Sequence, residues 1–215
     1  MKKNVEFALA ARRGIAVVAG TVLAVGAAAA GAGVASAAPV TKTLSYTCAF
    51  PLIGNGQVST DIAVTLPDAA VVGQPIEATD FSAAVSVPEE TVNGFDLLGA
   101  ATVEGSATVT AVVTDGAGSA QDVVIQDLPV PSTPIPESGA LVVTAAGPVP
   151  AVTPDAAGDA TIAVAETFTS KLTPKKADGS ETALGTFDLT CTVDAGQDAV
   201  LGTVPVAEAA VAHRS

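Results

Sequence analysis

The residue types that most often do chemistry are scarce in this chain and far apart. The single histidine, His213, stands near the last residue, where no third group is at hand to orient an imidazole for Ser-His-Asp or Cys-His catalysis. Carboxylates remain, because a pair of them can run a glycosidase without histidine. Glu89 and Glu90 are the clearest cluster, but adjacent side chains point apart and no second partner is evident. We predict no catalytic residues and no enzyme, with a carboxylate-based extracellular hydrolase as the alternative.

Two short segments carry carboxylates that could suit calcium, which takes hard oxygen ligands. Asp155 and Asp159 stand four residues apart around a glycine, and so do Asp194 and Asp198. Neither pair has the spacing of an EF-hand loop, and Asp and Gly are also ordinary turn residues. Zinc sites need histidine and free cysteine, which the chain hardly offers. We predict no metal and no cofactor, and keep a calcium-dependent adhesion domain as a second alternative.

Three lysines cluster in one candidate hairpin that turns at Asp178-Gly179. They are Lys171, Lys175 and Lys176. Such a patch could meet an anionic polymer of the cell wall, although lysines on a hairpin also serve to discourage edge-to-edge strand pairing. The three lysines are therefore the candidate polymer-binding residues.

The two cysteines, Cys48 and Cys191, are predicted to form a disulfide, because an exported chain is oxidised and offers them no other partner. Each stands on the apolar face of an alternating segment, so the two sulfurs can meet inside the core. Closing so long a loop should stabilise the fold by about 5 kcal/mol in the chain-entropy model. A bridge between the first and last strands also favours one compact domain.

The elements that must position these residues are predicted to be strands. Apolar and polar residues alternate with a period of two, valine and threonine are frequent, and Gly, Pro, Asn and Asp mark turns between the segments. This pattern indicates an antiparallel sandwich or barrel. The candidate strands are 44–50, 62–66, 85–87, 107–112, 123–128, 141–145, 161–172 and 186–193.

Two segments interrupt the strand pattern. Residues 129–136 carry four prolines and could be an interdomain linker or a crossing between two sheets. The predicted disulfide spans this segment and favours the crossing. Residues 89–98 contain Asn93-Gly94 in their middle, so we interpret them as a loop with at most one helical turn.

The N-terminal residues have the pattern of a signal peptide. Basic residues precede an apolar run over 14–35, and Ala35-Ser36-Ala37 supplies the small residues that signal peptidase accepts. We predict cleavage after Ala37, so that residues 1–37 are a signal peptide. The C-terminal residues carry no recognisable wall anchor, so a secreted or cell-wall-associated location is expected, with no membrane contact after cleavage.

The predicted mature chain is strongly acidic. Residues 1–37 hold four of the nine basic and one of the 22 acidic residues, which leaves five basic against 21 acidic residues. Binding to nucleic acid depends on lysine and arginine neutralising phosphates, so we exclude nucleic acid as a partner. The apolar content is nevertheless too high for a disordered chain.

Four motifs in order resemble a family of secreted actinobacterial domains that has no assigned function. They are YTCAFPLIG at 46–54, GAATVEG at 99–105, PKKADG at 174–179 and CTVDAGQ at 191–197. The resemblance spans roughly residues 43–206. It implies an exported, immunoglobulin-like antiparallel β-sandwich and supplies no catalytic residues.

The sequence therefore predicts a signal peptide at 1–37, one all-β sandwich domain with one disulfide at 38–206, and a flexible tail at 207–215. The expected function is that of a non-catalytic secreted or cell-envelope module that binds a wall polymer or an extracellular protein.

Overall fold

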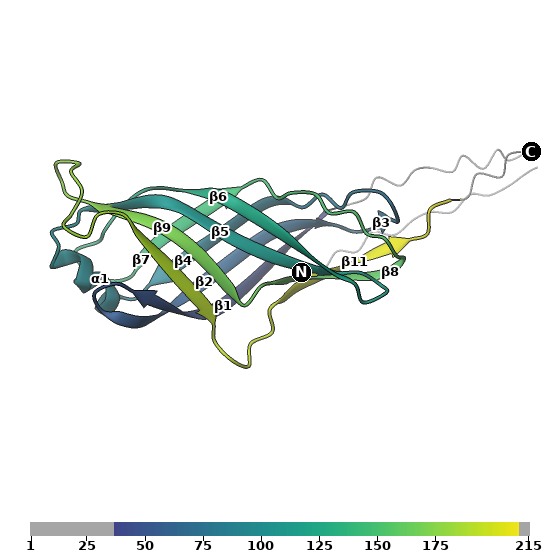
Figure 1. Ribbon diagram of the computed structural model, residues 1–215, viewed down its shortest axis with the longest axis horizontal. Coiled ribbons are helices and arrows are strands. Elements are labelled where there is room, and N and C mark those ends of the chain that lie inside the picture. The colour runs from purple at the N-terminus through teal and green to yellow at the C-terminus, as the bar shows by residue number, and fades with distance from the viewer. Residues whose placement is uncertain (1–36, 211–215) are drawn as a thin grey trace, which may run out of the picture. The chain divides into compact units, whose positions relative to one another are not determined.

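The computed structural model describes residues 37–210, and within them it shows an all-β protein with one short helix (Figure 1). Residues 1–36 of the predicted signal peptide, His213 and most of the predicted tail lie outside these residues. The strands are β1 (Ala37–Phe50), β2 (Gly54–Pro67), β3 (Ala70–Val71), β4 (Thr79–Val87), β5 (Thr102–Thr114), β6 (Ala120–Pro134), β7 (Leu141–Gly147), β8 (Gly158–Val164), β9 (Thr167–Lys175), β10 (Phe187–Val193) and β11 (Val200–Ala207). The helix is α1 (Glu89–Asp96).

The strands join in one hydrogen-bonded sheet with the order β3-β11-β8-β5-β9-β10-β1-β2-β4-β7. All pairings are antiparallel except that of β3 with β11. The long strand β5 pairs with β9 through its first half, with β8 through its second half, and with β6 along its other edge. β6 and β7 are also in contact, but no ladder joins them in residues 37–210. We call this contact between β6 and β7 the seam.

Apolar and polar residues alternate along the strands, so that the apolar face of each strand packs into one shared core. In β1, Leu44, Tyr46, Cys48 and Phe50 are buried, and in β10 Phe187, Leu189 and Cys191 are buried. Branched and apolar side chains on these faces pack against one another because successive strand residues point to opposite sides of the sheet. The all-β prediction is therefore confirmed. The immunoglobulin-like sandwich stays a prediction, and the observed ladders join all eleven described strands in one sheet.

The predicted loop at 89–98 is instead the two-turn helix α1. Pro88 precedes the helix with an extended backbone. The carboxylates of Glu89 and Glu90 lie in the first turn, where their negative charge interacts favourably with the positive end of the helix dipole. Val92 and Phe95 are buried against the core. This burial outweighs the poor helix propensity of Asn93-Gly94, which had favoured a loop.

Two further expectations about elements were wrong, and one strand was missed. The proline-rich segment is neither a linker nor a crossing but the second half of β6, which pairs with β5 as far as Pro134. The candidate strand 161–172 divides into β8 and β9, which are separated by Ala165 and Glu166. The strand β11 was not predicted, because Gly202 and Pro205 interrupt its pattern, although Val204 and Val206 are buried.

Candidate functional site

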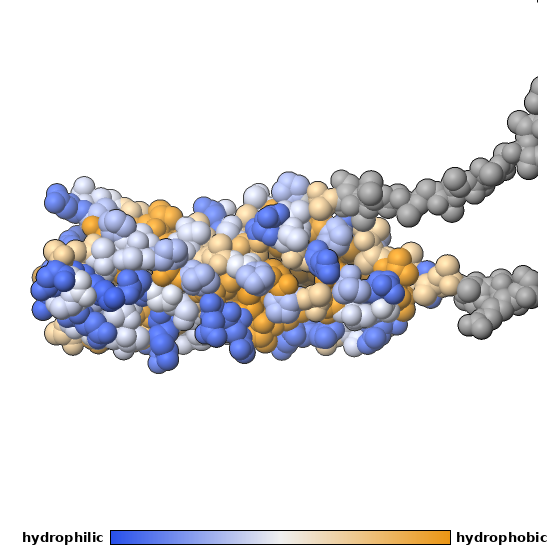
Figure 2. Space-filling view, turned by 90° about the horizontal axis from the view of Figure 1, so that it is seen from above, coloured by the Kyte–Doolittle hydropathy of each residue, from blue (hydrophilic) through white to orange (hydrophobic). Residues whose placement is uncertain are grey.

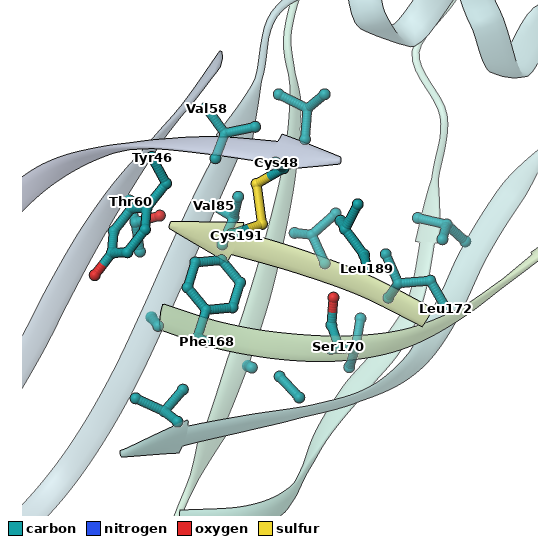
Figure 3. Close-up of a pocket in the computed structure, with 18 of the residues that line it drawn as sticks. Tyr46, Cys48, Val58, Thr60, Val85, Phe168, Ser170, Leu172, Leu189 and Cys191 are labelled. Carbon is teal, nitrogen blue, oxygen red and sulfur yellow. A yellow bond between two sulfur atoms is a disulfide. The ribbon is translucent and has the colours of Figure 1, made fainter. Parts of the chain in front are cut away.

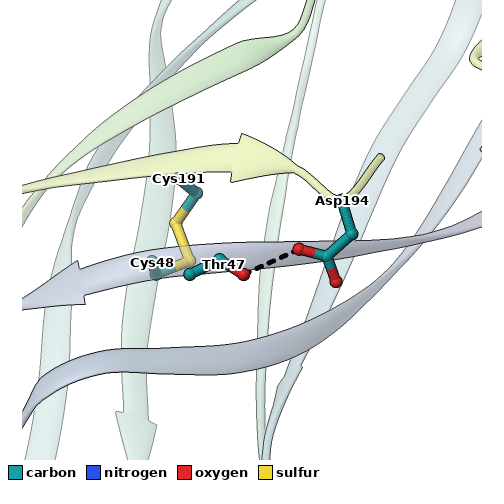
Figure 4. Close-up of a disulfide and its surroundings, with 4 residues drawn as sticks. All are labelled: Thr47, Cys48, Cys191 and Asp194. Atoms are coloured by element: carbon teal, nitrogen blue, oxygen red, sulfur yellow. Dashed lines mark hydrogen bonds between the residues drawn. A yellow bond between two sulfur atoms is a disulfide. The ribbon is translucent and has the colours of Figure 1, made fainter. Parts of the chain in front are cut away.

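The disulfide lies at one end of the β1–β10 ladder, where Cys48 and Cys191 are directly opposite one another (Figure 4). The two sulfurs are bonded, both residues are buried, and 143 positions separate them in the sequence. The predicted bridge is confirmed. Disulfides of this kind persist in oxidising compartments, which fits an extracellular environment.

The residues after β10 extend this ladder with side chains. The Thr47 hydroxyl donates a hydrogen bond to the Asp194 carboxylate at 2.7 Å (Figure 4). The amide of Gln197 pairs with the backbone of Ser45 in both directions, accepting from its N–H at 2.8 Å and donating to its carbonyl at 2.7 Å. Asp194 and Gln197 belong to the last of the four motifs. The structural role of this motif is therefore to attach the chain after β10 to β1.

Two of the four carboxylates considered for calcium, Asp194 and Asp198, are engaged in other contacts. Asp198 accepts hydrogen bonds from Lys42 at 2.8 Å and from the Val200 N–H at 2.9 Å, and these bonds hold the pKa of Asp198 below its usual value. Asp194 accepts a hydrogen bond from Thr47. Within residues 37–210 no group of three or more His, Cys, Asp or Glu residues is arranged to hold a metal ion.

The three candidate polymer-binding lysines lie on or just after β9, and two of them face carboxylates. Lys175 pairs with Glu104 on β5, and its hydrogen bond lowers the pKa of Glu104. The Lys171 Nζ lies 3.9 Å from the Asp188 Oδ1 on β10, and both side chains are largely exposed. Lys176 follows the strand in an exposed turn with Asp178. The lysines are close in sequence, but the structure surrounds them with negative charge.

One end of the domain presents apolar side chains to solvent. Leu52 and Ile53, in the turn between β1 and β2, are 62% and 45% exposed, and Leu97, directly after α1, is 89% exposed. Between the turn and the helix runs a shallow groove floored by Phe50, Phe95 and Phe187. We call Leu52, Ile53 and Leu97 the apolar end. The sequence pattern did not predict the apolar end, although Leu52-Ile53 is an apolar pair where turn residues are expected.

The interior contains a cavity of about 70 Å³, which we call the chamber (Figure 3). Inward-facing side chains of β1, β2 and β4 to β10 line it, together with Phe95 of α1. The lining is apolar apart from the hydroxyls of Tyr46, Thr60 and Ser170. Burial raises the pKa of Tyr46, whose ring packs edge-on against Phe168 with centroids 4.9 Å apart. No sequence pattern had indicated the chamber.

The space-filling view shows apolar surface in patches between polar side chains (Figure 2). Among residues 37–210, no helix is long and apolar enough to span a membrane.

Comparison with known proteins places the chain in a family without assigning it an activity. No curated protein and no solved structure matches it. Residues 45–202 match a family of unknown function, DUF6801. The matched range includes both cysteines and runs from β1 into β11, so the chain belongs to this family of unknown function.

Proposed function

We propose that this domain is a non-catalytic binding module of the cell exterior, and that its apolar end docks a partner protein. The observation that carries the proposal is that Leu52 and Ile53 are exposed beside the groove against α1, with Leu97 exposed directly after the helix. Isolated exposed apolar residues are common on soluble proteins, but a cluster beside a groove is typical of an interaction surface. The disulfide supports the extracellular setting.

A non-catalytic role fits the state of the carboxylates. A general acid at neutral pH needs a raised pKa, which burial in an apolar pocket provides. Here hydrogen bonds instead lower the pKa values of the half-buried Glu104 and of the exposed Asp178 and Asp198. Glu89 and Glu90 are exposed in the first turn of α1. No observation favours the carboxylate hydrolase or the calcium-dependent adhesion domain over a binding module.

The surroundings of the apolar end favour a protein over a wall polymer. Asp96 is exposed and directly precedes Leu97, and Glu89 and Glu90 are exposed in the first turn of the same helix. An anionic polymer would be repelled by these carboxylates, whereas a protein surface with an apolar centre and a basic rim would complement them. Lys171 and Lys175, which a polymer would need, already face carboxylates.

Co-sedimentation of residues 38–215 with isolated actinobacterial cell walls tests the proposal, with walls used either intact or after protease treatment. A protein partner predicts binding that protease treatment abolishes. Leu52→Ser with Leu97→Ser should weaken this binding at least tenfold. The matched control is Lys171→Gln with Lys175→Gln and Lys176→Gln, which should leave it unchanged.

Binding that survives protease treatment, falls with salt and is lost in the lysine variant would overturn the protein-docking proposal in favour of a polymer. Self-association through the apolar end is a third outcome. Sedimentation velocity would show it as a dimer that the serine variant dissociates, and the partner would then be a second copy of this chain.

A further inference from the structure

The chamber is one of two apolar cavities that follow one another along β2. The second has a volume of about 40 Å³ and lies between the opposite ends of β2, β5 and β8. Phe81, Val109 and Val164 line both cavities and are the partition between them. No charged residue contributes to either lining. On β2, the inward-facing residues from Val58 to Leu66 line first one cavity and then the other. At a strand rise of about 3.4 Å per residue, the two cavities together extend along roughly 27 Å of this strand.

Voids of this size are unusual in a protein interior, which packs as densely as an organic crystal. Their cause is visible in the side chains: Ala83, Ala107 and Ala145 face the chamber at positions where a larger residue would fill it. A water molecule needs about 10–15 Å³ and two to four polar partners, so an apolar cavity of about 70 Å³ has room for several waters but few partners for them. Such a cavity suits an apolar molecule.

One buried polar atom in the chamber lacks a partner. Thr60 is 3% exposed, and its Oγ1 makes no hydrogen bond. Tyr46 stands opposite Val58 on the neighbouring strand, so its ring is a diagonal neighbour of Thr60 on the same face (Figure 3). Buried hydroxyls are almost always satisfied, and this one can donate to or accept from a bound group. The matching ligand carries one neutral polar group on a long hydrocarbon chain.

A surface hollow leads towards the partition. Residues 78–81 and 146–149 line it, and Phe81 therefore borders the hollow and both cavities. The backbone is irregular here: Asp80 and Phe81 form a bulge opposite Val64 in the β2–β4 ladder, and Asp80 has a φ of +54°. Bulges re-aim side chains beside binding sites, and a left-handed non-glycine residue stores backbone strain.

The strand β6 has a second bulge beside the same point, in its ladder with β5. Gln126 and Asp127 on β6 face a single residue of β5, and Asp127 has a φ of +52°. The next residue, Leu128, packs over Gly147 at the end of β7, and Gly147 is paired with Phe81. Two strained bulges thus flank the last residue of β7, where the sheet is not closed by a ladder.

We propose that the two cavities bind the hydrocarbon chain of a neutral, single-chain lipid, with its polar group at Thr60, and that the chain enters beside Phe81. A charged headgroup is disfavoured, because neither lining offers a counter-ion. Phe50 and Phe95 lie between the chamber and the groove at the apolar end, but Leu52, Ile53 and Leu97 line neither cavity, so either proposal can fail without the other.

Fluorescence titration of delipidated residues 38–215 with cis-parinaric acid methyl ester tests the site, because this probe brightens in apolar surroundings. Saturable binding at one probe per chain is expected, with the free acid at least tenfold weaker at pH 8. Absence of saturable binding would overturn the proposal, and equal binding of the acid would overturn the neutral class of ligand.

Variants locate the probe. Ala145→Leu fills the chamber and should weaken ester binding at least tenfold, while Val142→Leu, on the exposed face of the same strand, should not. If Ala145→Leu does not fold, Thr60→Val is the second variant: it keeps the shape, removes the unpaired hydroxyl and should weaken ester binding about threefold to tenfold without lowering the melting temperature. Binding that neither folded variant changes would place the probe outside the chamber and overturn the site.

Discussion

On one side of the sheet, every residue of β1 from Ala37 to Phe50 has a partner in β2, and Cys48 is bonded to Cys191 in β10. On the other side, β6 and β7 touch at the seam without a ladder. Composition explains the difference. Pro129, Pro131 and Pro134 remove backbone donors from β6, and proline is confined to strand edges for this reason. The core is thus covalently closed on one side and has no ladder between the neighbouring strands β6 and β7 on the other.

This difference indicates where the domain can open. Separating two neighbouring strands breaks the fewest hydrogen bonds where no ladder joins them. The strands β6 and β7 at the seam should therefore be the first part of the sheet to separate. The bulge at Asp127 lies on β6 itself, and the bulge at Asp80 lies on β4, one strand away from the seam. Four measurements test whether the two sides differ in this way.

Removing the disulfide should have the largest effect. In Cys48→Ala with Cys191→Ala, the unfolded chain gains the freedom of a loop spanning 143 positions, which in the chain-entropy model lowers the free energy of unfolding by about 5 kcal/mol. Urea denaturation monitored by circular dichroism measures the change. An unfolding midpoint equal to that of the wild type would show that the β1–β10 side does not depend on its covalent bond.

Two glycine substitutions compare the sides directly. In Gly105→Ala, the new Cβ would collide with the backbone carbonyl of Lys171 in the β5–β9 ladder, so we expect a loss of about 3 kcal/mol. In Gly147→Ala, the Cβ would lie 2.8 Å from the end of the Leu128 side chain across the seam, and a loss of about 1 kcal/mol is expected because that side chain can move. Equal losses in urea denaturation would contradict a softer seam.

Amide hydrogen exchange should separate the two sides without mutation. Amides in the β6–β5 and β7–β4 ladders nearest the seam should exchange at least tenfold faster than those joining β1 to β2 and β10, because partial opening frees them first. Mass spectrometry of peptic peptides gives the rates. Uniform protection across all these strands would mean that the seam is as firmly closed as a ladder.

Much of the closed side could be predicted from the sequence. The period of two in 44–50 and 187–193 is local, and it places Cys48 and Cys191 on the buried faces that the structure shows. The seam could not be predicted, because which strand neighbours β6 is a long-range property that alternation does not encode. Even β11 escaped detection, since Gly202 and Pro205 hide a strand whose buried Val204 and Val206 depend on tertiary packing.

The two candidate sites, the apolar end and the chamber, also differ in whether the local sequence could predict them. The apolar end left a local signal in Leu52-Ile53, whereas the chamber results from short side chains that nine strands bring together. The sequence of one strand does not show that Ala145 and Ala107 leave a void. A void forms only where the side chains of the facing strands are also too short to fill the space. A helix at 89–96 was likewise decided by the burial of Val92 and Phe95 rather than by local propensity.

The smallest effect concerns Tyr46, which lies on the closed side next to the disulfide. Burial raises its pKa because ionisation would place a charge in an apolar interior. A group whose pKa is raised on folding contributes stability below its unfolded pKa and loses it as the pH rises through the folded value. The stability of the wild type should therefore decline above about pH 10, the ordinary tyrosine pKa.

Tyr46→Phe removes this ionisation and is the matched control. Its melting temperature should fall less than that of the wild type between pH 9 and 11. Because Tyr46 is the sole tyrosine and the chain has no tryptophan, ultraviolet absorbance reports its titration without interference. A tyrosine that titrates at its ordinary pKa while the protein stays folded would show that solvent reaches this part of the interior, and the closed side would then be no less accessible than the seam.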